Sequence, residues 1–175
     1  MLKIALIIAK QDFRDEEYFI PKSIFEAEEI EVKTVSSETG EALGSYGGTT
    51  NIDLSLEDLN IDIFDAIIFI GGAGASSYIE DEQCHQIAKD TVSQNKILGA
   101  ICIAPTILAR SGVLKNKKAT VWSKNLDKSA VKILKQEGVD YQQQDVVVDE
   151  NIVTANGPKA SRKFGEIIVR ILKEL

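Results

Sequence analysis

Six short apolar runs, separated by segments with helical spacing, constrain the fold more than any other feature of this sequence. Most of these runs are apolar along most of their length rather than at alternate positions, which is typical of strands buried on both faces of a parallel sheet. The runs are Lys3 to Ala9, Glu31 to Val35, Asp65 to Ile70, Ile97 to Ile101, Ala119 to Trp122 and Asn151 to Ala155. The pattern predicts an α/β fold with right-handed βαβ crossovers.

Helical spacing of apolar residues marks the connections between these runs. The predicted helices are Glu16 to Glu29, Asp81 to Asn95, Pro105 to Gly112, Ser123 to Glu137 and Lys159 to Leu175. A hairpin is expected where Gln144 to Asp149 is followed by the last apolar run. We therefore predict one domain over residues 1–175, a three-layer, flavodoxin-like sandwich with a mostly parallel sheet and helices on both faces.

The composition fits one globular domain and argues against several classes of partner. The chain has 175 residues, 44% of them hydrophobic, and a formal net charge of −7. That charge argues against nucleic acid or anionic lipid as the main partner, because either needs a basic surface. No apolar run approaches the roughly 20 residues of a membrane span, and the N-terminal run is too short for a signal peptide. A cytoplasmic protein without a membrane partner is expected.

The counts of cysteine and histidine limit the chemistry of any site. Cys84 and Cys102 supply neither a disulfide framework nor a four-ligand zinc site, and His85 is the one histidine. The glycine-rich stretch at residues 71–74 lacks the dinucleotide pattern G-x-G-x-x-G. No metal and no cofactor are expected. We interpret Cys84 as a packing residue and His85 as a surface histidine.

Cys102 lies where the strand pattern of Ile97 to Ile101 changes at once to a helical pattern that begins at Pro105. Such a junction forces the thiol into a tight strand-to-helix turn, the cysteine version of a nucleophile elbow. There, the free N–H groups and the positive dipole end of the following helix favour the thiolate. The alternative is that Cys102 is a small buried hydrophobe that ends a core strand.

Two further loops follow strand patterns, and ligands of open α/β sheets bind at the carboxyl ends of the strands. One loop carries Gly71 and Gly72, and the other leads to Glu17. The N–H groups of Gly72 and Ile103 are candidate donors to an anion beside the Cys102 sulfur. A plain tight turn at the two glycines and an ordinary solvated acid at Glu17 are the alternatives that these residues leave open.

Three motifs together resemble the DJ-1/PfpI family of the class I glutamine amidotransferase-like superfamily. They are Glu17 four residues before Pro21, Ile70-Gly71-Gly72-Ala73 and Ala100-Ile101-Cys102-Ile103-Ala104-Pro105, and the resemblance extends to Thr154-Ala155-Asn156-Gly157-Pro158 before the last helix. Their order and spacing match the family over nearly the whole chain. The resemblance implies that Cys102 is the reactive cysteine, that Glu17 hydrogen-bonds its sulfur as a protonated acid, and that Gly72 is an oxyanion donor. It also implies that Gly71, Ile103 and Trp122 line a substrate site.

The sequence departs from this family at both positions where a histidine is expected. Protease-like members carry histidine directly after the elbow cysteine, where this chain has Ile103. Glyoxalase-like members carry it at the end of the strand after the elbow helix, where Trp122 stands. Trp122 either packs in the core or lines the cysteine site and excludes water from it. The sequence does not decide whether Trp122 raises or lowers the pKa of the Cys102 thiol. His85 is on another predicted helix and does not replace the missing histidine.

Three functions are compatible with these residues. The first is weak cysteine-dependent chemistry on a small carbonyl compound, such as glyoxalase-like or deglycase-like action on a 2-oxoaldehyde, or another hydrolase reaction, with Glu17 as proton relay. The second is a redox-responsive, stress-related protein whose partner is an oxidant that reacts with Cys102. The third is a binding or structural module without turnover. The resemblance implies a homodimer or a larger homo-oligomer.

Overall fold

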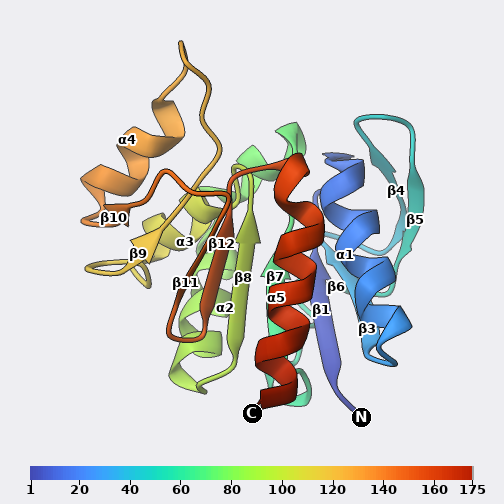
Figure 1. Cartoon of the computed structure of the whole chain (residues 1–175). Coiled ribbons are helices and arrows are strands. Elements are labelled where there is room, and N and C mark those ends of the chain that lie inside the picture. The colour runs from blue at the N-terminus through green and yellow to red at the C-terminus, as the bar shows by residue number, and fades with distance from the viewer. Residues whose placement is uncertain (175) are drawn as a thin grey trace.

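A seven-stranded sheet forms the centre of the computed structural model, which describes residues 1–174 (Figure 1). Its strands run in the order β11-β12-β8-β7-β1-β3-β6. Their bounds are β1 (Lys3–Ile7), β3 (Glu31–Ser36), β6 (Leu54–Ser55), β7 (Ala66–Phe69), β8 (Ile97–Ile101), β11 (Val146–Asp149) and β12 (Ile152–Ala155). Neighbours pair in parallel except β11, which forms the expected antiparallel hairpin with β12. The order of the five longest parallel strands is that of the flavodoxin-like sheet.

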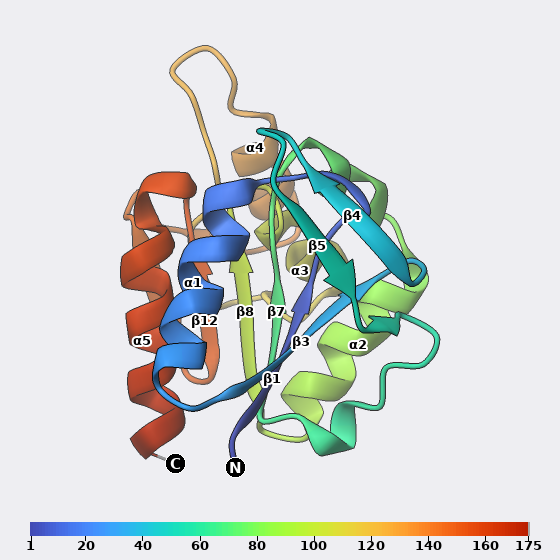
Figure 2. The ribbon, with the colours of Figure 1, turned by 90° about the vertical axis from the view of Figure 1, so that its right-hand side faces the viewer.

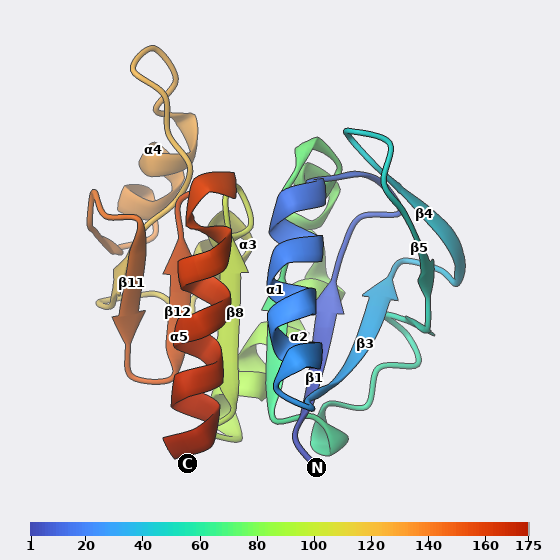
Figure 3. The ribbon, with the colours of Figure 1, turned by 45° about the vertical axis from the view of Figure 1, so that its right-hand side comes forward.

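Helices cover both faces of this sheet, which confirms the three-layer α/β prediction. α1 (Asp15–Ala27) and α5 (Ser161–Glu174) lie side by side on one face (Figure 3). α2 (Glu82–Ser93) and α3 (Pro105–Ser111) cover the other face, and α4 (Ser129–Gln136) packs on α3. Leu175, the end of the last predicted helix, is outside the described residues. Short 3-10 helices complete the connections: η1 (Ile61–Ile63), η2 (Ala73–Tyr78) and η3 (Pro158–Ala160).

The apolar faces of the helices explain why α1 and α5 stay together on the sheet. Phe164, Ile168 and Leu172 recur at intervals of four along α5 and are at most 3% exposed. Gly165 lies between them and lets α1 approach, because a Cβ there would sit 3.2 Å from the Cα of Pro21. The close packing of the two helices holds the N-terminus of α1, and with it Glu17, over the carboxyl end of the sheet.

The apolar run from Ala119 to Trp122 is not a strand of the main sheet, which corrects the sequence prediction. Only β9 (Lys118–Ala119) is extended, and it pairs with β10 (Asp140–Tyr141) in a separate two-stranded sheet. β12 already occupies the position beside β8. The N–H of Thr120 donates to the Thr154 hydroxyl at 3.0 Å, so the backbone of this segment bonds to other parts of the protein rather than to a strand ladder.

The helix predicted from Ser123 begins only at Ser129, and the residues before it form a protruding arm (Figure 1). The Asp127 carboxylate accepts hydrogen bonds from the N–H and hydroxyl of Ser129, at 3.0 and 2.6 Å. This local side-chain bond competes with helix formation and delays the helix start. Leu126 is therefore fully exposed on the arm instead of lying on the apolar face of a helix.

A glycine-rich hairpin beside α1 was missed in the sequence. β4 (Gly40–Gly44) and β5 (Thr49–Ile52) pair antiparallel, and β2 (Gln11–Phe13) joins β4 (Figure 2). The Asp15 carboxylate accepts the N–H groups of Tyr46 and Gly48, both at 2.8 Å, and so ties the turn to the start of α1. Within residues 1–174, no helix is long and apolar enough to span a membrane, and no cluster of metal-ligating side chains occurs.

Candidate active site

Three loops meet at the carboxyl end of the sheet, as the sequence predicted. β1 leads to Glu17 on α1, β7 leads to Gly71, and β8 leads to Cys102; β7 lies between the other two strands. The N–H of Gly71 donates to Glu17 Oε2 at 3.0 Å. A Cβ built on Gly71 would lie 2.5 Å from that same oxygen and 2.6 Å from the Cβ of Cys102. Glycine at this position therefore lets the acid and the cysteine lie next to each other.

Cys102 has the strained backbone of an elbow residue. Its φ angle is 64°, in the left-handed region that non-glycine residues seldom adopt. The N–H of Cys102 donates to the Ala155 carbonyl at 2.9 Å, and its carbonyl accepts the N–H of Trp122 at 2.8 Å. Two bonds to two different segments fix the conformation, whose strain costs about 1–3 kcal/mol. Cys102 is partly exposed as a residue, whereas Cys84 is buried.

The Glu17 carboxyl is fully buried beside this elbow, which rules out the ordinary solvated acid. Oε2 accepts the N–H of Gly71. Among residues 1–174, Oε1 is buried with no hydrogen-bond partner. The Cys102 side chain lies beside the carboxyl across Gly71, and the thiol lowers the pKa of Glu17. A buried carboxylate with a single backbone donor is poorly satisfied, so this environment favours the protonated acid.

Burial raises the pKa of Glu17 from 4.5 to about 7. The neighbouring Cys102 thiol, the positive charge of Arg14 and the N–H of Gly71 lower the pKa of the carboxyl and only partly offset burial. The site thus holds an acid that changes its charge near neutral pH. Such an acid is well matched to proton transfer at that pH.

The pKa of Cys102 is raised, which corrects the expectation that the elbow favours a thiolate. Burial is the largest cause, followed by the negative charge of the adjacent Glu17 carboxyl. The backbone N–H groups of Ile103 and Gly72 do lower the pKa of the thiol, as expected, but their effect is smaller. The Glu17 carboxyl and the Cys102 thiol therefore do not ionise together. As pH rises, Glu17 loses its proton first.

Gly72 provides its N–H through a conformation that other residues rarely adopt. Its φ is 108°, and a Cβ there would lie 2.5 Å from both the Arg14 nitrogen and the Asp12 carbonyl oxygen. The Arg14 N–H also donates to the Gly71 carbonyl at 3.0 Å. The loop after β7 is therefore locked against the chain after β1, with more constraint than a plain tight turn needs.

Ile103 and Trp122 are the residues that stand where the family resemblance predicts histidine. Ile103 follows Cys102 directly and is half-buried. Trp122 is also half-buried, and its contact with the elbow is the backbone bond to Cys102; its ring lies near Gly157, where a Cβ would be 3.7 Å from Cδ1. Neither side chain carries an acid–base group, so Glu17 is left for proton transfer at this site.

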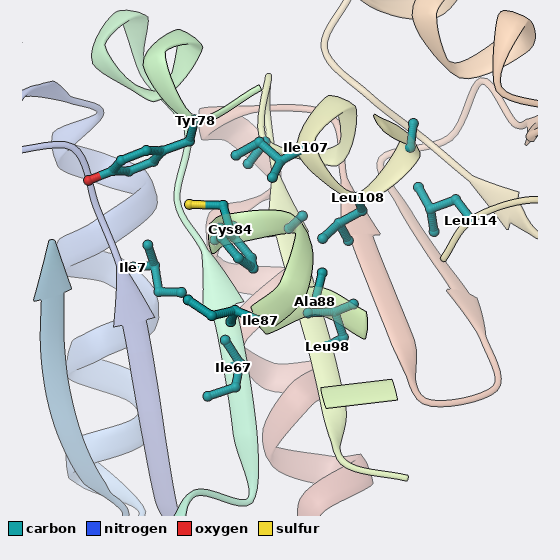
Figure 4. Packing of buried hydrophobic residues seen from close by; sticks show 14 of the residues in the cluster. Ile7, Ile67, Tyr78, Cys84, Ile87, Ala88, Leu98, Ile107, Leu108 and Leu114 are labelled. Carbon is teal, nitrogen blue, oxygen red and sulfur yellow. The ribbon is translucent and has the colours of Figure 1, made fainter. Parts of the chain in front are cut away.

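Cys84 and His85 lie away from the elbow, on α2. Cys84 is fully buried in the cluster between α2 and the sheet, near Tyr78 and Ile87 (Figure 4). His85 is half-buried rather than a free surface residue, and its Nε2 lies 2.7 Å from the Ile79 carbonyl oxygen. Cys84 is therefore a packing residue as expected, and the histidine has a local structural contact.

The roles of two residues that support the site were missed in the sequence. Thr154 is fully buried on β12 and accepts the Thr120 N–H, which fixes the segment that leads to Trp122. Arg14 lies over the Tyr46 ring at 4.6 Å and lowers the pKa of Glu17. A threonine inside an otherwise apolar strand was a visible signal for the first contact. The stacking of Arg14 depends on the unpredicted hairpin and had no signal.

Cys102 is expected to react with iodoacetamide before Cys84 at neutral pH. The reason is access, since burial raises the pKa of both thiols but Cys84 is fully buried and Cys102 partly exposed. Mass spectrometry of the folded protein after brief labelling measures the order. Labelling of Cys84 first, or of both thiols at equal rates, would contradict the geometry.

The fold and site define an α/β protein with a cysteine on a strand-to-helix elbow. The model of the DJ-1/PfpI family matches residues 2–171, and the chain belongs to this family. An uncharacterised protein of Methanocaldococcus jannaschii is 36% identical over 173 residues, 98% of this chain and 83% of the relative. A protein of Pyrococcus abyssi named a deglycase is 32% identical over 168 residues, 96% of this chain and 98% of the relative.

The structural comparison agrees with the sequence comparison. The crystal structure of a ThiJ/PfpI domain protein from Brachyspira murdochii superimposes with a TM-score of 0.94 at 34% identity. The match covers 99% of this chain and 97% of the other. The family resemblance drawn from the motifs is thereby confirmed.

Proposed function

We propose that this protein performs weak, Cys102-dependent chemistry on small carbonyl compounds of the 2-oxoaldehyde class, with Glu17 as the base and acid. The observation that carries the proposal is the buried Glu17 carboxyl beside the elbow cysteine, with a pKa of about 7 and Oε1 left without a hydrogen-bond partner among residues 1–174. Relatives named deglycase support cysteine-dependent carbonyl chemistry as the general kind of reaction.

The first step transfers the thiol proton of Cys102 to the Glu17 carboxylate as the sulfur attacks the aldehyde carbon. A C–S bond forms, and the carbonyl π electrons move to the oxygen. The N–H groups of Gly72 and Ile103 stabilise this oxygen, as oxyanion donors do in acyl transfer. Glu17 then returns the proton to the oxygen and completes a hemithioacetal. No metal or cofactor is needed for this step.

Glu17 carries the remaining proton transfers. Its carboxylate removes the hydrogen from the carbon bonded to sulfur, and the electron pair forms an enediol as the neighbouring ketone oxygen takes up a proton. Protonation of the neighbouring carbon, with loss of the hydroxyl proton, converts the enediol to a thioester. Water cleaves the thioester, so the sum of the reaction is addition of one water to the 2-oxoaldehyde to give a 2-hydroxy acid. Gly71 and Trp122 would border the substrate in this scheme.

A redox response is the second candidate. A partly exposed Cys102 beside a buried acid is also suited to oxidation to sulfenic and sulfinic acid, with Glu17 as a donor to the sulfinic oxygen. Mild peroxide would then add oxygen mass at Cys102 and leave Cys84 unchanged. Turnover of a carbonyl substrate distinguishes the two candidates.

Slow consumption of methylglyoxal is expected for the wild type, with no cleavage of an unstructured peptide. Both family histidine positions hold other residues, and a general base of that kind contributes about 10² to 10⁴ in rate. Addition of the sulfur to an aldehyde releases no amine. The absence of a histidine therefore slows this reaction less than it slows amide hydrolysis. The assay follows both substrates with purified protein.

Two alanine variants make this assay specific. Cys102→Ala should abolish consumption of methylglyoxal, whereas Cys84→Ala tests for general effects of removing a thiol and should leave the rate within a few-fold of wild type. Peptide cleavage that disappears only in Cys102→Ala would replace the proposal with a protease. Equal rates in wild type and Cys102→Ala would remove the cysteine from the reaction.

A further inference from the structure

Two fully buried side chains carry a polar atom without a hydrogen-bond partner, and both lie between α1 and α5. Within residues 1–174, three buried side-chain nitrogen or oxygen atoms make no hydrogen bond: Glu17 Oε1, Ser161 Oγ and Arg110 Nε. Arg110 Nε is compensated by a carboxylate oxygen of Glu80 at 2.9 Å. The other two atoms belong to residues that are 0% exposed. Because an unpaired buried polar atom costs stability, each of them requires an explanation.

Ser161 differs from the other buried hydroxyl groups in helices. A helical serine or threonine commonly donates to a backbone carbonyl one turn earlier. Ser111 donates to the Leu108 carbonyl, and Thr91 donates to the Ile87 carbonyl, both at 2.7 Å. The Ser161 hydroxyl makes no such bond. It is therefore free to bond to a group on another element.

The packing of α1 on α5 places Ser161 opposite Glu17. Both helices begin at the carboxyl end of the sheet and run side by side in the same direction (Figure 3). A Cβ on Gly165 would lie 3.1 Å from Ile24 Cδ1 and 3.2 Å from Pro21 Cα, so these parts of the two helices are in contact. Ser161 and Glu17 are each four residues earlier than Gly165 and Pro21, about 6 Å nearer the carboxyl end of the sheet.

Glu17 lies on the side of α1 that faces α5. Glu17, Pro21 and Ile24 are spaced by four and then three residues, which places them in one row along the helix. The last two contact α5 at Gly165, and Glu17 continues their row toward the elbow. Its Oε2 is bonded to the Gly71 N–H, so Oε1 is the oxygen that remains for a group on α5.

Ser161 is the polar group that α5 provides at this level. Among the described residues of α5, it is the one buried residue with a polar side chain. The charged residues that follow it, Arg162 and Lys163, are exposed. The titratable groups that act on Glu17 are Cys102, Arg14 and Glu16, which belong to the elbow and to the start of α1 rather than to α5.

We propose that Ser161 is a positioning residue of the site, whose hydroxyl donates, directly or through one bound water, to Oε1 of the Glu17 carboxylate. A hydroxyl donates and a carboxylate oxygen accepts, so each group supplies what the other lacks. With the Gly71 N–H on Oε2 and Ser161 on Oε1, both oxygens are held while the Cys102 thiol gives up its proton. The inference deepens the proposed function and rests on it for the role of Glu17 as base, but the contact itself is measured without turnover.

Titration of the Glu17 carboxyl in a Ser161→Ala variant, followed by ¹³C NMR of glutamate-labelled protein, tests the proposal. Alanine removes only the hydroxyl and is a good helix former, so the variant is expected to fold. A hydrogen bond to the charged carboxylate is stronger than one to the neutral acid. Its loss should therefore raise the midpoint of Glu17 by about 1 unit above that of the wild type.

The sign of the shift distinguishes positioning from packing. If the hydroxyl only filled space, its removal would loosen the site and admit water, and the midpoint would fall, because burial is the main cause that raises the pKa of Glu17. A fall or an unchanged midpoint in Ser161→Ala would overturn the proposal.

Ser111→Ala is the matched control. It also removes a buried helical hydroxyl, but one that is bonded to the Leu108 carbonyl, so the midpoint of Glu17 should stay at the wild-type value. An equal rise in both alanine variants would count against a specific contact. In the methylglyoxal assay, the rise of kcat/KM with pH should move upward in Ser161→Ala together with the midpoint. A raised midpoint without turnover in the wild type would support the Ser161 contact and reject the proposed function.

Discussion

Glu17→Gln should abolish most of the loss of stability that the wild type shows as pH rises from about 5 to 8. The folded protein holds the Glu17 proton up to about pH 7, whereas the unfolded chain releases it near 4.5. Between these values the folded state binds more protons, so its free energy of unfolding falls as pH rises. This contribution of Glu17 to stability is fully present below the pKa of the carboxyl in the unfolded chain. It is lost as pH rises through the pKa of the carboxyl in the folded protein. The rise in the Glu17 pKa from 4.5 to about 7 corresponds to about 3 kcal/mol in the free energy of unfolding.

Denaturant unfolding of both proteins at a series of pH values measures this effect. The control is Glu16→Gln at the adjacent position, where a hydrogen bond with Arg14 lowers the pKa of Glu16 and the sign of the linkage is opposite. The free energy of unfolding of the Glu16→Gln variant should therefore still fall as pH rises from about 5 to 8. A wild-type protein that gains stability from pH 5 to 8, or a Glu17→Gln variant with the same slope as wild type, would show that the carboxyl is not held protonated.

Glu17→Ala and Glu17→Gln should both lower Cys102-dependent consumption of methylglyoxal by about 10² to 10⁴. Glutamine keeps the size of the side chain and a hydrogen-bond donor beside the sulfur, but it does not take up the thiol proton. A loss in the Glu17→Gln variant close to that in the Glu17→Ala variant therefore identifies proton transfer rather than packing as the role of the carboxyl.

The pH profile separates these roles further. In the wild type, kcat/KM should rise through about pH 7 as Glu17 becomes the base. The Glu17→Gln variant should lack this rise at every pH where it is folded. If that variant keeps the wild-type rate and profile, the acid–base role belongs to another group.

The sheet and the three loops of the site could be predicted because they depend on local patterns. Strands such as Ile97 to Ile101 are apolar throughout, and the change to helical spacing at Pro105 fixes where the elbow must lie. In an open parallel sheet, the loops after neighbouring strands reach the same edge, so Glu17 and Cys102 could be placed together. Family resemblance supplied the pairing of these two residues; burial of Glu17 agrees with it.

The features that could not be predicted from the sequence depend on contacts between distant residues. Thr120 to Trp122 has the composition of a strand, but its backbone bonds to Thr154 and Cys102 instead. Leu126 has helical spacing, yet the Asp127 side chain delays the helix. The sign of the pKa shift at Cys102 also escaped prediction, because it is the balance of burial against two N–H groups and only the structure shows how deeply the pair is buried.

The titration of the Glu17 carboxyl itself tests the account most directly. The ¹³C chemical shift of its carboxyl carbon, recorded from pH 4 to 9 in protein labelled at glutamate and assigned by comparison with Glu17→Gln, follows the proton without any assay of activity. We predict a midpoint of about 7, set first by burial. A midpoint near the ordinary value of 4.5 would contradict the proposed role of Glu17 as the base for Cys102.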